Sequence, residues 1–76
     1  MTEMEWLDIF ADNLYEMLCN ANMSQKELAD RTGMSEASIS AYLNGRKLPG
    51  LKAIVNIAMV LDCSVGDLVD FGDMIF

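Results

Sequence analysis

Residues 24–45 read SQKELADRTGMSEASISAYLNG, a pattern typical of two short helices separated by a tight turn. Ser24 can cap the first helix, because its hydroxyl can accept a hydrogen bond from the backbone N–H three residues later. Gly33 stands where a chain leaving a helix often needs a positive φ, which glycine adopts without steric cost. Ser35 can cap the second helix in the same way, and Gly45 can end it.

A small residue is needed where two such helices cross, and Ala29 occupies that place. The segment resembles the helix-turn-helix of the Cro and lambda-repressor-like (Xre-type) DNA-binding domains. The residues that carry the resemblance are Gln25, Ala29, Gly33, Met34, Ile39, Tyr42, Asn44 and Gly45. Residues 47–69, KLPGLKAIVNIAMVLDCSVGDLV, resemble the fourth and fifth helices of that family.

The resemblance implies an all-α fold: a compact five-helix Cro/lambda-repressor-like domain with the helix-turn-helix at helices 2 and 3. We expect one domain over residues 1–76, because the chain is too short for two cores. The expected helices cover residues 2–21, 24–32, 35–44, 51–61 and 65–70, followed by an apolar tail at 71–76.

Helical periodicity predicts which faces turn inward. For the first helix the predicted face is Met4, Leu7, Ala11, Leu14, Leu18 and Ala21. For the fourth helix it is Leu51, Ile54, Val55, Ile57, Ala58 and Leu61. Met59 falls beside Lys52 and Asn56 on the side expected to be wet, so we interpret it as exposed or at an interface.

The net charge of −7 argues against DNA binding, because phosphate contacts rely on lysine and arginine. The charges are nevertheless segregated along the chain. All five basic residues lie between positions 26 and 52 together with three acids, and the flanks hold the other nine acids and no base. Screening limits exposed charges to a range of about 8 Å, so the local sign matters more than the total.

The resemblance implies roles for exposed residues of the helix-turn-helix. The candidates for contacts to DNA bases are Glu36, Ala37, Ser40 and Ala41. The candidates for contacts to the DNA backbone are Gln25, Lys26, Asn44, Arg46 and Lys47. Each of these polar side chains can instead be a solvated or capping group.

Two further surfaces suggest protein partners. The tail carries Phe71, Met74, Ile75 and Phe76, which together with Met59 are our candidates for a homodimer interface. Folding of the tail over its own core is the alternative. The acidic side of the first helix is either a solvated face or a surface for another protein.

Other classes of function are disfavoured. With no histidine, no glycine-rich phosphate loop and no cluster of metal ligands, we expect neither an enzyme nor a bound metal or cofactor. Cys19 and Cys63 are most simply reduced thiols of a cytoplasmic protein, with Cys63 in the core. The sequence contains no run of 18 apolar residues, so we expect no membrane span.

The sequence therefore predicts a bacterial or phage transcriptional regulator, of the repressor type, that binds a palindromic operator in double-stranded DNA as a homodimer. The alternative is a protein-binding module on the same fold, such as an antitoxin, an anti-repressor or an adaptor, since a fold does not by itself determine a function.

Overall fold

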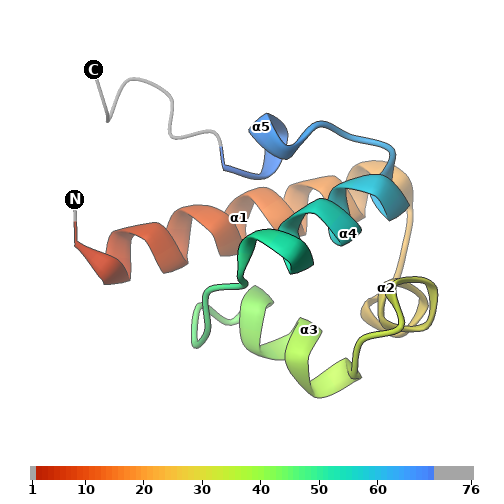
Figure 1. Cartoon of the computed structure of the whole chain (residues 1–76), viewed down its shortest axis with the longest axis horizontal. Helices are drawn as coiled ribbons and strands as arrows, with labels where there is room; N and C mark the ends of the chain where they lie inside the picture. Colours follow the sequence, from red (N-terminus) through yellow and green to blue (C-terminus); the bar gives the residue numbers. More distant parts are fainter. Residues whose placement is uncertain (1, 70–76) are drawn as a thin grey trace.

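The computed structural model describes residues 2–69, with every side chain in that range except that of Glu3. The described range contains five helices and no strand, which confirms the predicted fold class (Figure 1). The helices are α1 (Glu3–Ala21), α2 (Gln25–Thr32), α3 (Glu36–Leu43), α4 (Leu51–Leu61) and α5 (Val65–Leu68). In the same range, no helix combines the length and the apolar character needed to cross a membrane.

Hydroxyl caps begin four of the five helices. The side-chain oxygens of Thr2, Ser24, Ser35 and Ser64 each accept a hydrogen bond from the backbone N–H three residues later, at 3.0–3.3 Å. At Ser64 the capping box is complete, because its own N–H donates to Asp67 Oδ2 at 3.0 Å. These bonds satisfy N–H groups that have no partner within the helix, so each start position is encoded locally.

α2 and α4 each end at a residue with a positive φ, and only at the end of α2 is this residue the glycine that such a turn favours. Gly33 follows α2 with φ +76°, and its N–H donates to the carbonyl of Ala29. Asp62 follows α4 with φ +54°, a conformation that costs a residue with a side chain roughly 1–2 kcal/mol. At both positions the chain leaves the helix and turns towards the next one.

The core lies where α1 passes the other helices. Its fully buried side chains come from all five elements: Phe10, Leu14, Leu28, Ile39, Ile57 and Leu68. In Figure 1, α1 runs behind α4, with α2 and α3 on one side of this pair and α5 on the other. The helix-turn-helix is thus packed on the α1–α4 pair, with α3 against α1 and α2 against α4.

The end of α5 differs from the prediction. The helix stops at Leu68, with Val69 as its C-cap, instead of reaching residue 70. The side-chain amide of Asn13 donates to the carbonyl of Leu68 at 2.9 Å, so α1 satisfies a helix-terminal acceptor. Residue 70 and the predicted tail at 71–76, with Phe71, Met74, Ile75 and Phe76, lie outside the described residues.

Some residues that periodicity assigns to the inward faces of α1 and α4 are exposed in the structure. Met4 and Ala21 are both exposed on α1. At Met4 the reason is that the N-terminal end of this 19-residue helix extends past the elements that cover its middle (Figure 1). Leu51 and Val55 are exposed on α4, since only the side of α4 that carries Ile57, Ala58 and Leu61 meets the core.

Candidate nucleic-acid interface

The turn between α2 and α3 is held by the hydroxyl of Thr32. This hydroxyl donates to the carbonyls of Leu28 and Ala29, at 2.8 and 3.2 Å, and accepts from the N–H of Met34 at 3.3 Å. The Asn56 side chain of α4 donates to the carbonyl of Thr32 at 2.8 Å. Asn56 is therefore half-buried and positions the turn, although the periodicity of α4 predicts a wet position for it.

The inner side of α3 is fixed by two side chains. Ile39 is fully buried, and Tyr42 meets the ring of Phe10 edge-on, with centroids 6.3 Å apart and planes at 88°. Aromatic pairs favour this arrangement because the positive ring edge meets the negative ring face. The contact joins α3 to α1, and it determines which side of α3 remains in solvent.

The outer side of α3 carries the four candidate base-contact residues. Glu36 and Ala37 are exposed in the first turn, and Ser40 and Ala41 are half-buried one turn later. The structure thus brings these four residues onto one side of a single helix, as the resemblance implies. Their role in reading DNA is still a prediction.

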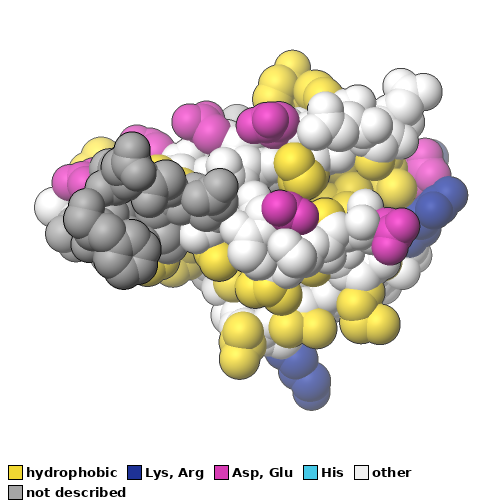
Figure 2. Space-filling view, turned by 90° about the horizontal axis from the view of Figure 1, so that it is seen from above, with side chains coloured by type: hydrophobic (Ala, Val, Ile, Leu, Met, Phe, Trp, Pro, Cys, Tyr) yellow, Lys and Arg dark blue, Asp and Glu magenta, His cyan; other side chains and the backbone are white. Residues whose placement is uncertain are grey.

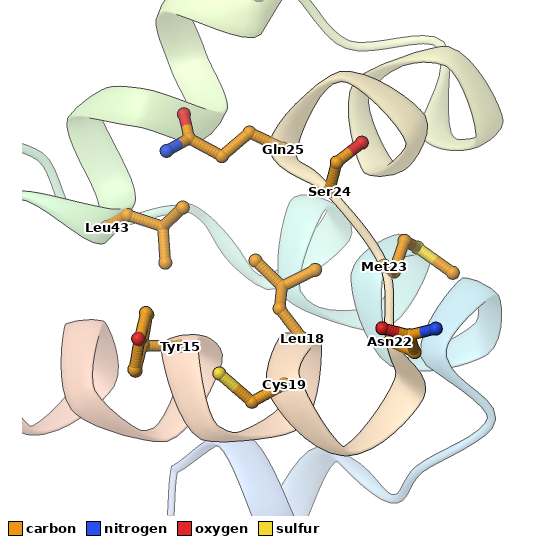
Figure 3. Close-up of a pocket in the computed structure, with 8 residues that line it drawn as sticks. All are labelled: Tyr15, Leu18, Cys19, Asn22, Met23, Ser24, Gln25 and Leu43. Atoms are coloured by element: carbon orange, nitrogen blue, oxygen red, sulfur yellow. The ribbon is translucent and has the colours of Figure 1, made fainter.

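The candidate backbone contacts fall at two adjacent corners of the helix-turn-helix. Gln25 and Lys26 are exposed in the first turn of α2. Asn44, Arg46 and Lys47 are exposed just after α3. Gln25 lines the same groove as Leu43, the last residue of α3 (Figure 3).

The side chain of Asn44 is already engaged within α3. Its amide nitrogen donates to the carbonyl and to the hydroxyl oxygen of Ser40, at 2.8 and 3.1 Å. The amide nitrogen carries two hydrogens, enough for these two bonds. The structure thereby links a candidate backbone contact to a candidate base contact.

Acidic groups reach the same region. Arg31 forms an ion pair with Glu27, with Arg31 Nη2 2.7 Å from Glu27 Oε2, so its charge is partly compensated. Asp8 of α1 lies against the turn after α3, with Oδ1 3.3 Å from the place that a Cβ on Gly45 would take. The sequence does not reveal this approach of Asp8 to the turn that precedes Arg46, because it depends on how α1 packs on α3.

A family model described as helix-turn-helix matches residues 14–68, which include all of α2, α3 and α4. The chain belongs to the Xre-type helix-turn-helix family. It is 30% identical over 57 residues to the uncharacterized HTH-type transcriptional regulator YqaE of Bacillus subtilis, with 75% of this chain and 49% of YqaE covered. It is 33% identical over 60 residues to the uncharacterized regulator YozG of the same organism, with 78% of this chain and 71% of YozG covered.

Solved structures of transcription factors share the fold. The hypothetical transcription factor NHTF from Neisseria superposes with a TM-score of 0.81 at 26% identity, covering 91% of this chain and 79% of that one. The SOS-response repressor LexA from Eubacterium rectale gives a TM-score of 0.84 at 20% identity, covering 97% and 79%. YqaE and YozG are HTH-type transcriptional regulators, which is the class that the sequence predicts for this chain. The chain spans about half the length of YqaE.

This Xre-type domain also has an open groove, with a volume of about 530 Å³, which sequence reasoning missed (Figure 3). Tyr15 and Cys19 line it from α1, and Gln25 and Leu43 lie across from them. A hydrogen bond with the thiol of Cys19 raises the pKa of Tyr15. Tyr15 could not be singled out from the sequence, because only the packed arrangement brings it to face the helix-turn-helix.

Within residues 2–69, no group of three or more metal-ligating side chains is arranged to hold an ion. Cys19 is exposed, and Cys63 is half-buried against the core instead of inside it.

The two thiols are expected to differ in reactivity. Burial raises the pKa of Cys63, and the nearby carboxylates of Asp67 and Asp62 raise it further. Because the thiolate is the reactive form and Cys19 is the more exposed thiol, iodoacetamide at neutral pH should label Cys19 faster than Cys63. The Cys63 rate should keep increasing to a higher pH than is usual for cysteine. Peptide mass spectrometry measures both rates, and denaturant should abolish the difference; equal rates in the folded protein would contradict this assignment.

Proposed function

We propose that this chain is a sequence-specific DNA-binding regulator of the repressor type, which inserts α3 into the major groove of a palindromic operator as a homodimer. The observation that carries the proposal is the two-sided character of α3. Its inner side is buried through Ile39 and Tyr42, and its outer side presents only short or acidic groups to solvent. A helix of this kind reaches base edges with its N-terminal residues.

The exposed side of α3 suits weak contacts to several bases. The Glu36 carboxylate can accept from the amino group of cytosine, and the Ala37 and Ala41 methyl groups can touch the methyl group of thymine. Ser40 can bond to several bases. Since none of these is a bidentate reader such as arginine on guanine, part of the discrimination must come from DNA shape.

Positioning on the duplex would come from the two exposed corners of the helix-turn-helix. The first turn of α2, with Gln25 and Lys26, adds the positive end of a helix. Arg46 and Lys47 follow α3 and supply two full positive charges. Backbone contacts of this kind orient a protein on DNA without reading its sequence.

The test is selection from a pool of random-sequence duplexes at low and at physiological salt. We expect enrichment of a palindrome whose half-sites lie about 34 Å apart, one helical turn, because a symmetric dimer presents two copies of α3. A pool selected with the Ala37→Glu variant is the control, since a second acid in the first turn of α3 should abolish enrichment. Binding that disappears at moderate salt without enrichment would overturn the proposal.

A protein-binding role is the second candidate. Glu5, Asp8, Asp12 and Glu16 are all exposed and recur at helical spacing on α1. Such a row repels phosphate and can attract a basic protein surface. If the DNA selection fails, capture of a basic partner that is lost in an Asp12→Lys/Glu16→Lys variant would support this function.

A further inference from the structure

A row of exposed apolar side chains runs along α4. Leu51, Val55 and Met59 recur every four residues, with exposed fractions of 73%, 39% and 76%. We call these three residues the α4 row. Leu48, in the loop before the helix, extends the row at its N-terminal end and is 40% exposed. Hydrophobic side chains gather along the lower edge of the molecule in Figure 2. This edge is the side that faces the viewer in Figure 1, where α4 lies in front of α1.

The rest of α4 is already used by the fold. Ile57, Ala58 and Leu61 enter the core, and Asn56 bonds to the carbonyl of Thr32. The α4 row has no such role among the described residues, although contiguous apolar surface on a small protein commonly marks an interface. The question is therefore what covers it.

We propose that the α4 row packs against the same row of a second copy, with the two α4 helices antiparallel about a two-fold axis at Val55. The spacing of the row is symmetric about this residue. Leu51 and Met59 each lie about 6 Å from Val55 along the helix, so each Leu51 faces Met59 of the second copy. A surface that matches itself in this way forms a closed dimer and not a chain.

Charge favours the antiparallel direction. Lys52 lies near the start of α4, and Asp62 caps its end. An antiparallel pair points each Lys52 toward the end of the other helix, where Asp62 lies, whereas a parallel pair would place like charges together. The first turn of α4 has no acid and its last turn has no base, so no side chain of α4 itself compensates the dipole of this helix. A partner running the other way supplies that compensation.

The pairing specifies a surface for the homodimer and rests on that part of the proposed function. A single pair of helices buries less than the roughly 1,200 Å² typical of stable complexes. We therefore expect a dimer with a dissociation constant in the micromolar range, measurable by sedimentation of the full chain.

Disulfide trapping tests the register. In a Cys19→Ser/Cys63→Ala background, Val55→Cys should give a cross-linked dimer on mild oxidation, because the two copies of this position meet at the axis. Leu51→Cys should not, because its two copies lie about 12 Å apart along the helices, beyond the reach of a disulfide. Tyr15→Cys, on α1 at a position more exposed than Val55, controls for random collision.

A charge exchange provides a second readout. Leu51→Lys or Met59→Glu alone should weaken the dimer at least tenfold, and the double variant should restore it by pairing opposite charges. Circular dichroism of each variant shows whether it is folded. Absence of Val55→Cys cross-links, or equal cross-linking of Leu51→Cys, would overturn the register. Cross-linking that appears only after residues 70–76 are deleted would mean that the chain's own tail covers the row.

The outcome is separable from that of the DNA selection. A dimer that binds an operator without cross-linking at Val55 would retain the proposed function and overturn this interface. A cross-linked dimer without operator enrichment would retain this interface and overturn the proposed function.

Discussion

Replacing Arg46 and Lys47 with alanine is expected to weaken binding to every duplex sequence by about 10- to 30-fold at physiological salt. Both side chains are exposed just after α3, where a duplex lying along α3 would bring its phosphates. Each lost phosphate contact should also reduce the slope of log K against log salt concentration by about one. Fluorescence anisotropy of a labelled duplex over a salt series measures both quantities.

Arg31→Gln is the matched control for this pair. It removes a charge of the same sign from the helix-turn-helix, but the Arg31 guanidinium already lies 2.7 Å from a carboxylate oxygen of Glu27. In the double variant the slope of log K against log salt concentration changes by a certain amount for each charge removed. We expect Arg31→Gln to change that slope by less than half of this amount. If the double variant kept the parental slope, Arg46 and Lys47 would not face phosphate.

Phe10→Ala should have the largest effect on stability. The ring is almost completely buried and packs edge-on against Tyr42, with centroids 6.3 Å apart. Truncation of a buried phenylalanine costs about 3–5 kcal/mol, through lost transfer energy and the cavity that remains. That is a large part of the total of about 5–15 kcal/mol expected for a domain, so partial unfolding at 37 °C should result. Urea titration followed by circular dichroism measures the change.

Tyr15→Ala is the control on the same helix. Tyr15 is aromatic too, but 65% of it is exposed, so its truncation should cost less than about 1 kcal/mol. Similar losses for the two variants would mean that the Phe10–Tyr42 contact does not anchor α3. If Phe10→Ala loses DNA binding at temperatures where α1 is still helical, the Phe10–Tyr42 contact is needed to hold α3 in the position that binds DNA.

Features that depend on a few neighbouring residues could be predicted from the sequence. Ser24, Ser35 and Ser64 cap helices because a hydroxyl and an N–H three residues later are close in any helix start. Gly33 takes a positive φ because the turn after α2 requires one. The arrangement of α2 and α3 follows from these local signals together with the small Ala29.

Features that depend on how the helices cross could not be predicted. Asn56 falls on the wet side of α4 by periodicity, yet α2 passes close enough for its amide to reach Thr32. The approach of Asp8 to Gly45 and the exposure of Leu51 have the same origin. Periodicity assigns a side of a helix, but only the neighbouring helices determine how far along that side the cover extends.

The bonds of Asn44 bear on how tightly this corner of α3 can hold DNA. In the unbound domain its amide already closes the last turn and holds the hydroxyl of Ser40. A phosphate that takes a hydrogen from this amide must first break one of those bonds. Contact at this corner is therefore an exchange of one partner for another, and the net gain is much smaller than a new hydrogen bond would give. Ser40 and Asn44 should accordingly behave as one unit in double-mutant cycles, with effects that do not add.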